Sequence, residues 1–154
     1  MLEELAAETY GRWLMRANGR NRELRDRHAG AERCLVVGNG PSLRSHDITV
    51  LRQEVTIVAN SFYEHPDAAT VAPAYCCIGD PRFMYDQSNN VAWLAEIEAA
   101  LPATTLFVRS SGRALFAKHG LFKHHSVYWR NSGAQVCRAD QVELDLTRPA
   151  NVGM

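Results

Sequence analysis

The sequence predicts an α/β fold in which a mainly parallel, doubly wound sheet is covered by helices. Short apolar runs alternate along the chain with segments of helical periodicity, which is the order that βαβ units require. The apolar runs do not alternate with polar residues, which is typical of strands that are covered on both faces. The length of 154 residues and the hydrophobic content of 46% suffice for one domain with a buried core.

The chain opens on a predicted helix over residues 2–28. Its apolar residues recur roughly at helical spacing, and most other positions are basic or acidic. The dipeptide Asn18-Gly19 favours a turn and can interrupt this helix. We interpret the charges as a solvated face rather than as a phosphate-binding one. The predicted organisation is a helical extension over residues 1–30 and an α/β domain over residues 31–154.

Five apolar runs with the composition of strands follow this opening segment. They cover residues 34–37, 55–59, 75–78, 105–108 and 126–129. The clearest helix between them is predicted over residues 91–101, where an apolar stripe ends at Pro102. A shorter helix is predicted over residues 111–119, because Gly120 stands where a helix commonly ends.

The composition narrows the class of partner. With 17 basic and 17 acidic residues the formal net charge is zero, so bulk charge gives no argument for nucleic acid or a membrane surface as the partner, and we expect no nucleic acid. No apolar run is long enough to span a bilayer and no signal-peptide pattern opens the chain, so we expect a cytoplasmic protein. The cysteines Cys34, Cys76, Cys77 and Cys137 form no C-x-x-C pair. They predict buried free thiols rather than a zinc site or disulfides.

Polar residues follow every predicted strand. In open parallel sheets, ligands bind outside the carboxyl ends of the strands. The residues found there are Gly38-Asn39-Gly40-Pro41-Ser42, Asn60-Ser61, Gly79-Asp80-Pro81, Arg109-Ser110-Ser111-Gly112 and Arg130-Asn131-Ser132-Gly133. Amides, hydroxyls, one acid and two arginines are groups that bind sugar hydroxyls, base edges and phosphates.

The loop after the first strand has two interpretations. Glycine at positions 38 and 40 permits a positive φ and lets a ligand approach the backbone closely. Pro41 suits the first position of a helix, which would leave the N–H groups of Ser42 and Leu43 as donors for an anion. The loop is not a dinucleotide fingerprint, because Leu43 stands where the third glycine would be, and it is not a P-loop. By pattern alone, a tight turn between strand and helix explains it nearly as well.

Three longer strings carry a resemblance to known families. They are "VVGNGPSL", "VTIVANSFY" and "YCCIGDPRFM". Together they resemble the MptE-like 6-hydroxymethylpterin diphosphokinase family and the related small bacterial sialyltransferases that use CMP-sialic acid. The sialyltransferases have Asn-Pro after the third strand, whereas the MptE-like proteins typically have Asp-Pro, as this chain does at Asp80-Pro81. The resemblance covers residues 33–83 and resumes at "NSGAQVC", residues 131–137.

The resemblance implies a Rossmann-like, three-layer α/β/α fold and a transferase that binds a nucleotide or nucleotide sugar. The substrate would be of the ATP or CMP-sugar type, with Mg²⁺ at a diphosphate. A sialyltransferase-like glycosyltransferase that uses a CMP-sugar is the alternative. Residues 138–154 do not match the family's C-terminal half, so we expect a truncated domain. A non-catalytic fragment or binding module is therefore the alternative of another class.

The residues expected to bind the nucleotide follow from this resemblance. They are Gly38, Asn39, Gly40, Pro41, Ser42, Asn60, Asp80, Ser132 and Gly133. Asp80 could hold a metal that bridges to a diphosphate or cap a helix at Pro81, and we favour the ligand side. Ser132 and Gly133 could complete the cleft or only cap a helix. Arg109 and Arg130 could offset phosphate charge, although each alone is more typical of a surface arginine.

No catalytic residue is predicted. The sialyltransferases take their general base from a histidine in the unmatched half, and none of the six histidines here falls at a matching motif. His65, next to Pro66, is interpreted as a loop residue. An NAD(P)-dependent oxidoreductase is disfavoured, because Asn60 ends the second strand where such enzymes carry an acid.

Overall fold

The computed structural model describes residues 19–130 of the chain. These residues belong to two compact units, residues 28–127 and a second unit formed by residues 19–27 and 128–130. Of the predicted N-terminal helix only the end is described. It contains η1 (Gly19–Leu24), which is a 3-10 helix rather than a continuing α-helix.

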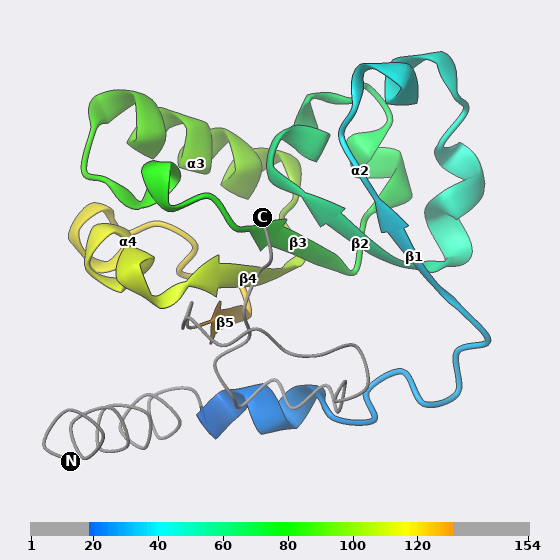
Figure 1. Ribbon diagram of the computed structural model, residues 1–154, viewed down its shortest axis with the longest axis horizontal. Coiled ribbons are helices and arrows are strands. Elements are labelled where there is room, and N and C mark those ends of the chain that lie inside the picture. The colour runs from blue at the N-terminus through cyan, green and yellow to red at the C-terminus, as the bar shows by residue number, and fades with distance from the viewer. Residues whose placement is uncertain (1–18, 131–154) are drawn as a thin grey trace, which may run out of the picture. The chain divides into compact units, whose positions relative to one another are not determined.

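The predicted α/β fold with a parallel sheet is confirmed (Figure 1). The strands are β1 (Cys34–Val37), β2 (Val55–Ala59), β3 (Tyr75–Ile78), β4 (Thr105–Arg109) and β5 (Val127–Arg130). Their order in the sheet is β1-β2-β3-β4-β5, and β1–β2, β2–β3 and β3–β4 pair in parallel. The first three strands have the predicted bounds, while the last two end one residue later.

The connections contain three α-helices and several short 3-10 helices. The α-helices are α2 (Ala68–Val71), α3 (Ser88–Ala100) and α4 (Arg113–His119). The 3-10 helices after η1 are η2 (Pro41–Ser45), η3 (Thr49–Gln53), η4 (Asn60–Glu64), η5 (Pro81–Met84) and η6 (Ser110–Gly112). The predicted end of α4 is confirmed, since Gly120 follows it with a left-handed φ of 65°. The predicted start at Ser111 is wrong, because that residue lies in η6.

The core lies between one face of the sheet and the helices. Val58, Ile78 and Leu106 are at most 1% exposed, and Leu94 and Ile97 of α3 are 0% exposed. Along β2 and β4 the buried residues alternate with half-buried ones. Consecutive strands are neighbours, so right-handed crossovers place successive helices on one face, where α2 and α3 lie together (Figure 1).

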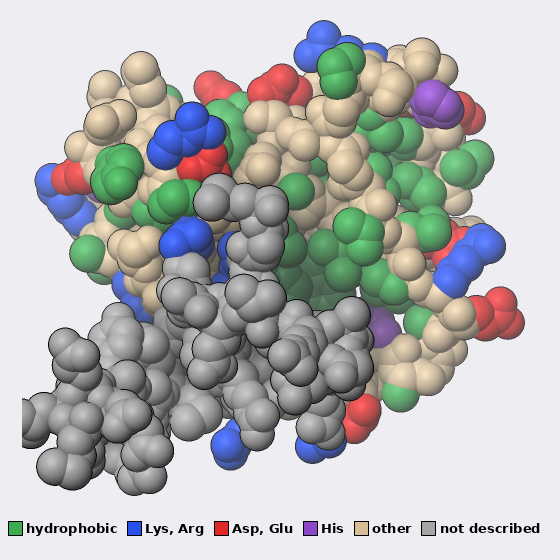
Figure 2. All heavy atoms as spheres, viewed as in Figure 1, with side chains coloured by type: hydrophobic (Ala, Val, Ile, Leu, Met, Phe, Trp, Pro, Cys, Tyr) green, Lys and Arg blue, Asp and Glu red, His purple; other side chains and the backbone are tan. Residues whose placement is uncertain are grey.

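The other face of the sheet is less covered, although its side chains are apolar. Val36 of β1 is 80% exposed, and Ile57 and Phe107 are half-buried. Figure 2 shows hydrophobic side chains gathered over β1 and β2. The apolar runs in the sequence are unbroken, yet burial alternates along the strands. The strand order explains this, because it places the helices on one face of the sheet.

The second unit is organised around Tyr128, which is 1% exposed. Its hydroxyl donates to Glu23 Oε2 at 3.2 Å and accepts from Arg27 Nη2 at 2.8 Å. The guanidinium carbons of Arg20 and Arg27 lie 5.4 and 5.5 Å from the centre of its ring. The sequence predicted that these arginines lie on a solvated face. In the structure they also contact an aromatic ring.

The described cysteines differ in their burial. Cys76 is 0% exposed, and burial, with a smaller contribution from Cys77, raises the pKa of its thiol to about 12. The predicted burial is wrong for Cys34, which is exposed, and Cys77 is half-buried. Cys137 lies outside the described residues. None of the helices in residues 19–130 has the length and apolar character needed to cross a membrane.

Two buried threonines of this core should respond oppositely to replacement by valine, one with a gain and one with a loss of stability. Thr56 in β2 is 0% exposed, and its Oγ1 has no hydrogen-bond partner among the described residues. Replacing a buried, unpaired hydroxyl by a methyl group of the same shape removes a desolvation penalty. We expect Thr56→Val to raise the free energy of unfolding by about 1 kcal/mol in urea titrations.

The matched control is Thr104→Val. Thr104 is 3% exposed, and its Oγ1 donates to the Pro73 carbonyl at 2.8 Å. This variant should lower the free energy of unfolding by about 1 kcal/mol. Equal destabilisation by both substitutions would show that the Thr56 hydroxyl is satisfied in solution.

Candidate functional site

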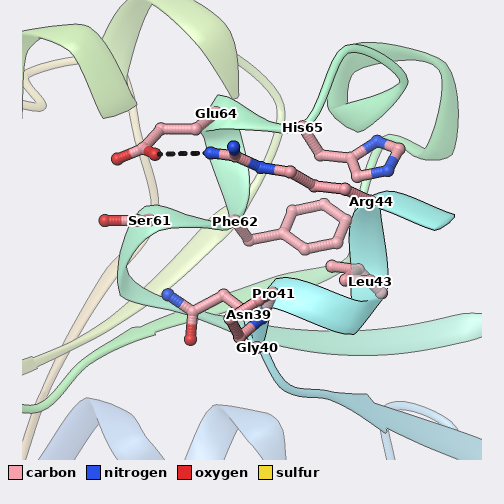
Figure 3. A pocket seen from close by; sticks show the side chains of 9 residues that line it. All are labelled: Asn39, Gly40, Pro41, Leu43, Arg44, Ser61, Phe62, Glu64 and His65. Atoms are coloured by element: carbon pink, nitrogen blue, oxygen red, sulfur yellow. Dashed lines mark ion pairs between the residues drawn. The ribbon is translucent and has the colours of Figure 1, made fainter.

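A pocket of about 260 Å³ lies at the carboxyl ends of β1 and β2 (Figure 3). Nine residues line it: Asn39, Gly40, Pro41, Leu43, Arg44, Ser61, Phe62, Glu64 and His65. The parallel register pairs Val37, the last residue of β1, with Val58 of β2. The segments that follow the two strands therefore leave the sheet at the same edge, as predicted for a ligand site.

The glycines of the β1 loop do not have the expected positive φ. Gly40 is extended, with φ −66° and ψ 158°, and Gly120 is the one described glycine with a positive φ. A Cβ on Gly38 would meet no atom within 4 Å, and one on Gly40 would meet only Ser42 Oγ, at 4.0 Å. The backbone conformation at Gly40 is open to any residue. What the two glycines provide is open space beside an exposed loop.

Pro41 begins a helix as predicted, but the helix is the 3-10 segment η2. In a 3-10 helix the N–H of residue i+3 donates to the carbonyl of residue i, so the backbone amides find partners one residue earlier than in an α-helix. The Leu43 N–H donates to the Gly40 carbonyl at 3.0 Å. The prediction that Leu43 leaves a free backbone donor for an anion is therefore wrong.

Asn60 stands at the end of β2 in a left-handed conformation with φ 46°. This region is uncommon for residues other than glycine, and asparagine tolerates it better than most. The Oδ1 atom of Asn60 is buried and has no hydrogen-bond partner within residues 19–130. The next residue, Ser61, lines the pocket. At this point the lining is therefore supplied by Ser61, and Asn60 is not one of the lining residues.

The segment η4 is fixed to the body of the domain by its aromatic residues. Phe62 is 1% exposed, and the Tyr63 hydroxyl donates to Glu96 Oε2 of α3 at 2.6 Å. Burial, followed by the hydrogen bond to Glu96, raises the pKa of Tyr63 above its usual range, so this phenol remains a donor. The Tyr63 ring also packs edge-on against Trp93, with centroids 6.3 Å apart.

Two charged side chains approach each other over the pocket (Figure 3). The Arg44 Nη2 atom lies 3.9 Å from Glu64 Oε2, and the two side chains are 77% and 48% exposed. An exposed ion pair at this distance contributes about 0–1 kcal/mol. The guanidinium can therefore exchange its carboxylate for an anionic ligand at little cost.

His65 lies in a loop, as interpreted from the sequence, directly after η4. It also lines the cavity and is 8% exposed. Its Nδ1 accepts a hydrogen bond from the Asp67 N–H at 3.1 Å. The neighbouring Pro66 predicts a loop but does not show which cavity the loop borders, so the sequence carried no signal for this position.

At the end of β3, Asp80 has the capping role that was the second of its two interpretations. It is the N-cap of η5, and its Oδ1 accepts from the Arg82 N–H at 2.8 Å. The same carboxylate pairs with the Arg82 side chain, with Nη2 2.6 Å from Oδ2. Arg109 Nη1 donates to the Gly79 carbonyl at 3.5 Å. The described residues contain no group of three or more His, Cys, Asp or Glu arranged to hold a metal ion.

The structure therefore brings together part of the predicted site. Asn39, Gly40 and Pro41 line the pocket, Gly38 and Ser42 belong to the same loop, and Asn60 adjoins Ser61. Asp80 is not among the lining residues. Ser132 and Gly133 lie outside the described residues, and Arg130 is the last residue of β5. Comparisons of the chain with protein-family models, curated proteins and solved structures found no match.

The capping role of Asp80 predicts a dependence on pH. Hydrogen bonds from the Arg82 side chain, and then from its backbone N–H, lower the pKa of Asp80. A lowered pKa in the folded state contributes stability above the unfolded pKa of about 3.9, and this contribution is lost as the pH falls through the folded pKa. In Asp80→Asn, which keeps a cap of similar quality, the stability deficit relative to wild type should be present at pH 7 and vanish in acid.

Urea unfolding of both proteins from pH 7 to pH 2.5 measures this difference. A carboxyl ¹³C titration of the folded protein gives the pKa of Asp80 directly. A midpoint at or above about 3.9 would contradict the observed pairing with Arg82.

Proposed function

We propose that the pocket at the ends of β1 and β2 binds a nucleotide or nucleotide sugar, as the substrate site of a transferase. The observation that carries the proposal is the pocket at the carboxyl ends of two parallel strands, which the Asn39 amide and the Arg44 guanidinium line. Ligands of open parallel sheets bind at this edge. Amide and guanidinium N–H groups donate hydrogen bonds to phosphate and sugar oxygens.

The loop after β1 also favours a nucleotide as the ligand of this pocket. The space above Gly38 and Gly40 is open, so a ribose or phosphate can lie against the backbone there. The Asn39 amide and the Arg44 guanidinium line the cavity and supply donors to phosphate oxygens. These donors match the acceptor oxygens of a phosphate group.

The class of reaction is proposed from the resemblance of the loop, of Asn60 and of Asp80-Pro81 to the MptE-like diphosphokinases. An ATP-type substrate and Mg²⁺ fit that class, in which the ion would offset the charge of the diphosphate. Asp80 is paired with Arg82 and Glu64 with Arg44, so we assign neither carboxylate to the metal. A CMP-sugar is the substrate in the sialyltransferase-like alternative.

A thermal-shift experiment with the whole chain tests the proposal. The ligands are CMP, CTP, ATP, GTP and UDP, each with and without Mg²⁺. A ligand at 100 times its Kd stabilises the native state by about 2.7 kcal/mol, so one of them should raise the Tm. A response to ATP that needs Mg²⁺ favours the diphosphokinase class, and a response to CMP without Mg²⁺ favours the glycosyltransferase class.

Two variants connect the response to the pocket. Asn60→Gly keeps a residue that accepts the left-handed backbone and removes the amide, so the ligand-induced shift should disappear from a folded chain. Gly40→Ala should keep the Tm of the unliganded protein, because its Cβ meets no clash, and should weaken the shift. No shift with any nucleotide from a cooperatively folded wild-type chain would reject the proposal and favour a non-catalytic module.

The Arg44–Glu64 pair leads to a separate prediction for affinity. Glu64→Gln removes a negative charge from the pocket and releases the guanidinium that it pairs with. We expect this variant to bind the stabilising nucleotide about three to ten times more tightly, which corresponds to roughly 0.7–1.4 kcal/mol. Isothermal titration calorimetry measures the Kd.

The control for charge is Glu54→Gln, because Glu54 pairs with Arg33 and does not line the pocket. It should leave the Kd unchanged. Weaker binding by Glu64→Gln would mean that the carboxylate itself contacts the ligand.

A further inference from the structure

We propose that the Ser61 hydroxyl binds a ribose hydroxyl of the nucleotide, so that the pocket selects ribonucleotides over their deoxy forms. The inference rests on the proposed nucleotide site and names a specificity-determining contact within it. Ser61 is the second residue of η4, is half-buried and lines the pocket. Its side chain has no hydrogen-bond partner among residues 19–130. Both the donor and the acceptor capacity of this hydroxyl are therefore open to a ligand in the cavity.

The backbone at the start of η4 determines which residue reaches the pocket. Asn60 is left-handed, with φ 46°, and Ser61 follows with φ −77° and ψ 18°. Two such different conformations in succession bend the chain where it leaves β2. After this bend Ser61 lines the cavity, whereas Asn60 does not. The neighbouring Phe62 is 1% exposed and anchors the segment, so the position of the Ser61 hydroxyl is set by the fold.

The parallel register brings Asn39 to the same part of the pocket. Val37 pairs with Val58, so Asn39 lies two residues beyond this pair along one chain segment, and Ser61 lies three residues beyond it along the other. Neighbouring strands are about 4.8 Å apart. Figure 3 shows the Asn39 and Ser61 side chains on the left of the pocket, away from Leu43. A small group of a ligand on this side of the cavity therefore has two polar side chains as neighbours.

The chemical character of the lining matches different groups to different parts of a nucleotide. The Arg44 guanidinium is cationic and only donates hydrogen bonds, which suits phosphate oxygens. The carboxylate of the lining, Glu64, is paired with Arg44 at 3.9 Å. The Ser61 hydroxyl is neutral and both donates and accepts, as a ribose hydroxyl does, and the Asn39 amide carries an acceptor oxygen beside its N–H groups. Ser61 is therefore matched to the sugar rather than to the phosphate.

Ligand analogues test the inference on the wild-type chain. Calorimetry measures the Kd of CMP, ATP and UDP, each beside its 2′-deoxy and 3′-deoxy forms, with and without Mg²⁺. We expect the loss of one of these two hydroxyls to weaken the binding of the nucleotide about five- to tenfold, as for a neutral hydrogen bond. Equal affinities for a ribonucleotide and both of its deoxy forms would overturn the inference while the nucleotide site stands. If none of the ribonucleotides binds, the proposed function itself fails and the inference fails with it.

A double-mutant cycle connects this preference to Ser61. In Ser61→Ala, the ribonucleotide should bind about five- to tenfold more weakly, and removing the same hydroxyl from the ligand should then cause little further loss. Because the protein group and the ligand group are changed separately and together, the cycle isolates the contact between them. A purely structural role of Ser61 predicts an equal loss for both ligands and an unchanged preference, and that result would contradict the assignment.

The matched control is Ser126→Ala. Ser126 is exposed, directly precedes β5 and is not among the residues that line the pocket. This variant should keep the Kd of the ribonucleotide and the ratio of the two affinities. A reduced ratio in Ser126→Ala would show that the preference does not depend on the Ser61 contact and would reject the inference.

Discussion

The register of the parallel ladder is the constraint on which the site depends. Val58 of β2 pairs with Val37 of β1 on one side and with Cys76 of β3 on the other. Val58 and Cys76 are buried on the helix-covered face, and a slip of one residue would turn every side chain of the strand to the opposite face. The burial of the core therefore fixes the height at which each strand ends. It thereby places Asn60 and the loop around Asn39 at the same edge of the sheet.

The 3-10 helices after the first three strands determine what kind of site can form there. Each of them turns the chain tightly at the sheet edge, and η2 uses an early amide in its own i to i+3 bond. Fewer free backbone N–H groups are therefore available to a ligand, and recognition depends more on side chains. Ser61, Phe62 and Glu64 of η4 line the pocket, and His65 directly follows this segment. The tight turn thereby brings most of the short segment to the pocket.

The strands were predictable because their apolar runs end sharply at polar residues, and β1, β2 and β3 have the predicted bounds. The loop at Asn39 was predictable for the same reason. The roles of Arg44, Glu64 and His65 were not, because their proximity arises from the pairing of β1 with β2 rather than from any local pattern. For Asp80 the local pattern left two interpretations open, and the side chain of Arg82, two residues away, provides the partner that completes the cap.

The neutral composition of the chain and a donor-rich pocket are compatible, because several of the described acidic side chains are paired with basic ones. Asp80 is bound to Arg82, Glu54 to Arg33, and Asp86 to Lys118. Within the pocket the one carboxylate is held by an exposed arginine at 3.9 Å, while the imidazole beside them is buried. Electrostatic interactions weaken steeply with solvent exposure, so the exposed ion pair by itself contributes little. A net charge of zero provides no bulk attraction to a charged partner, so recognition depends on the polar side chains that line the pocket.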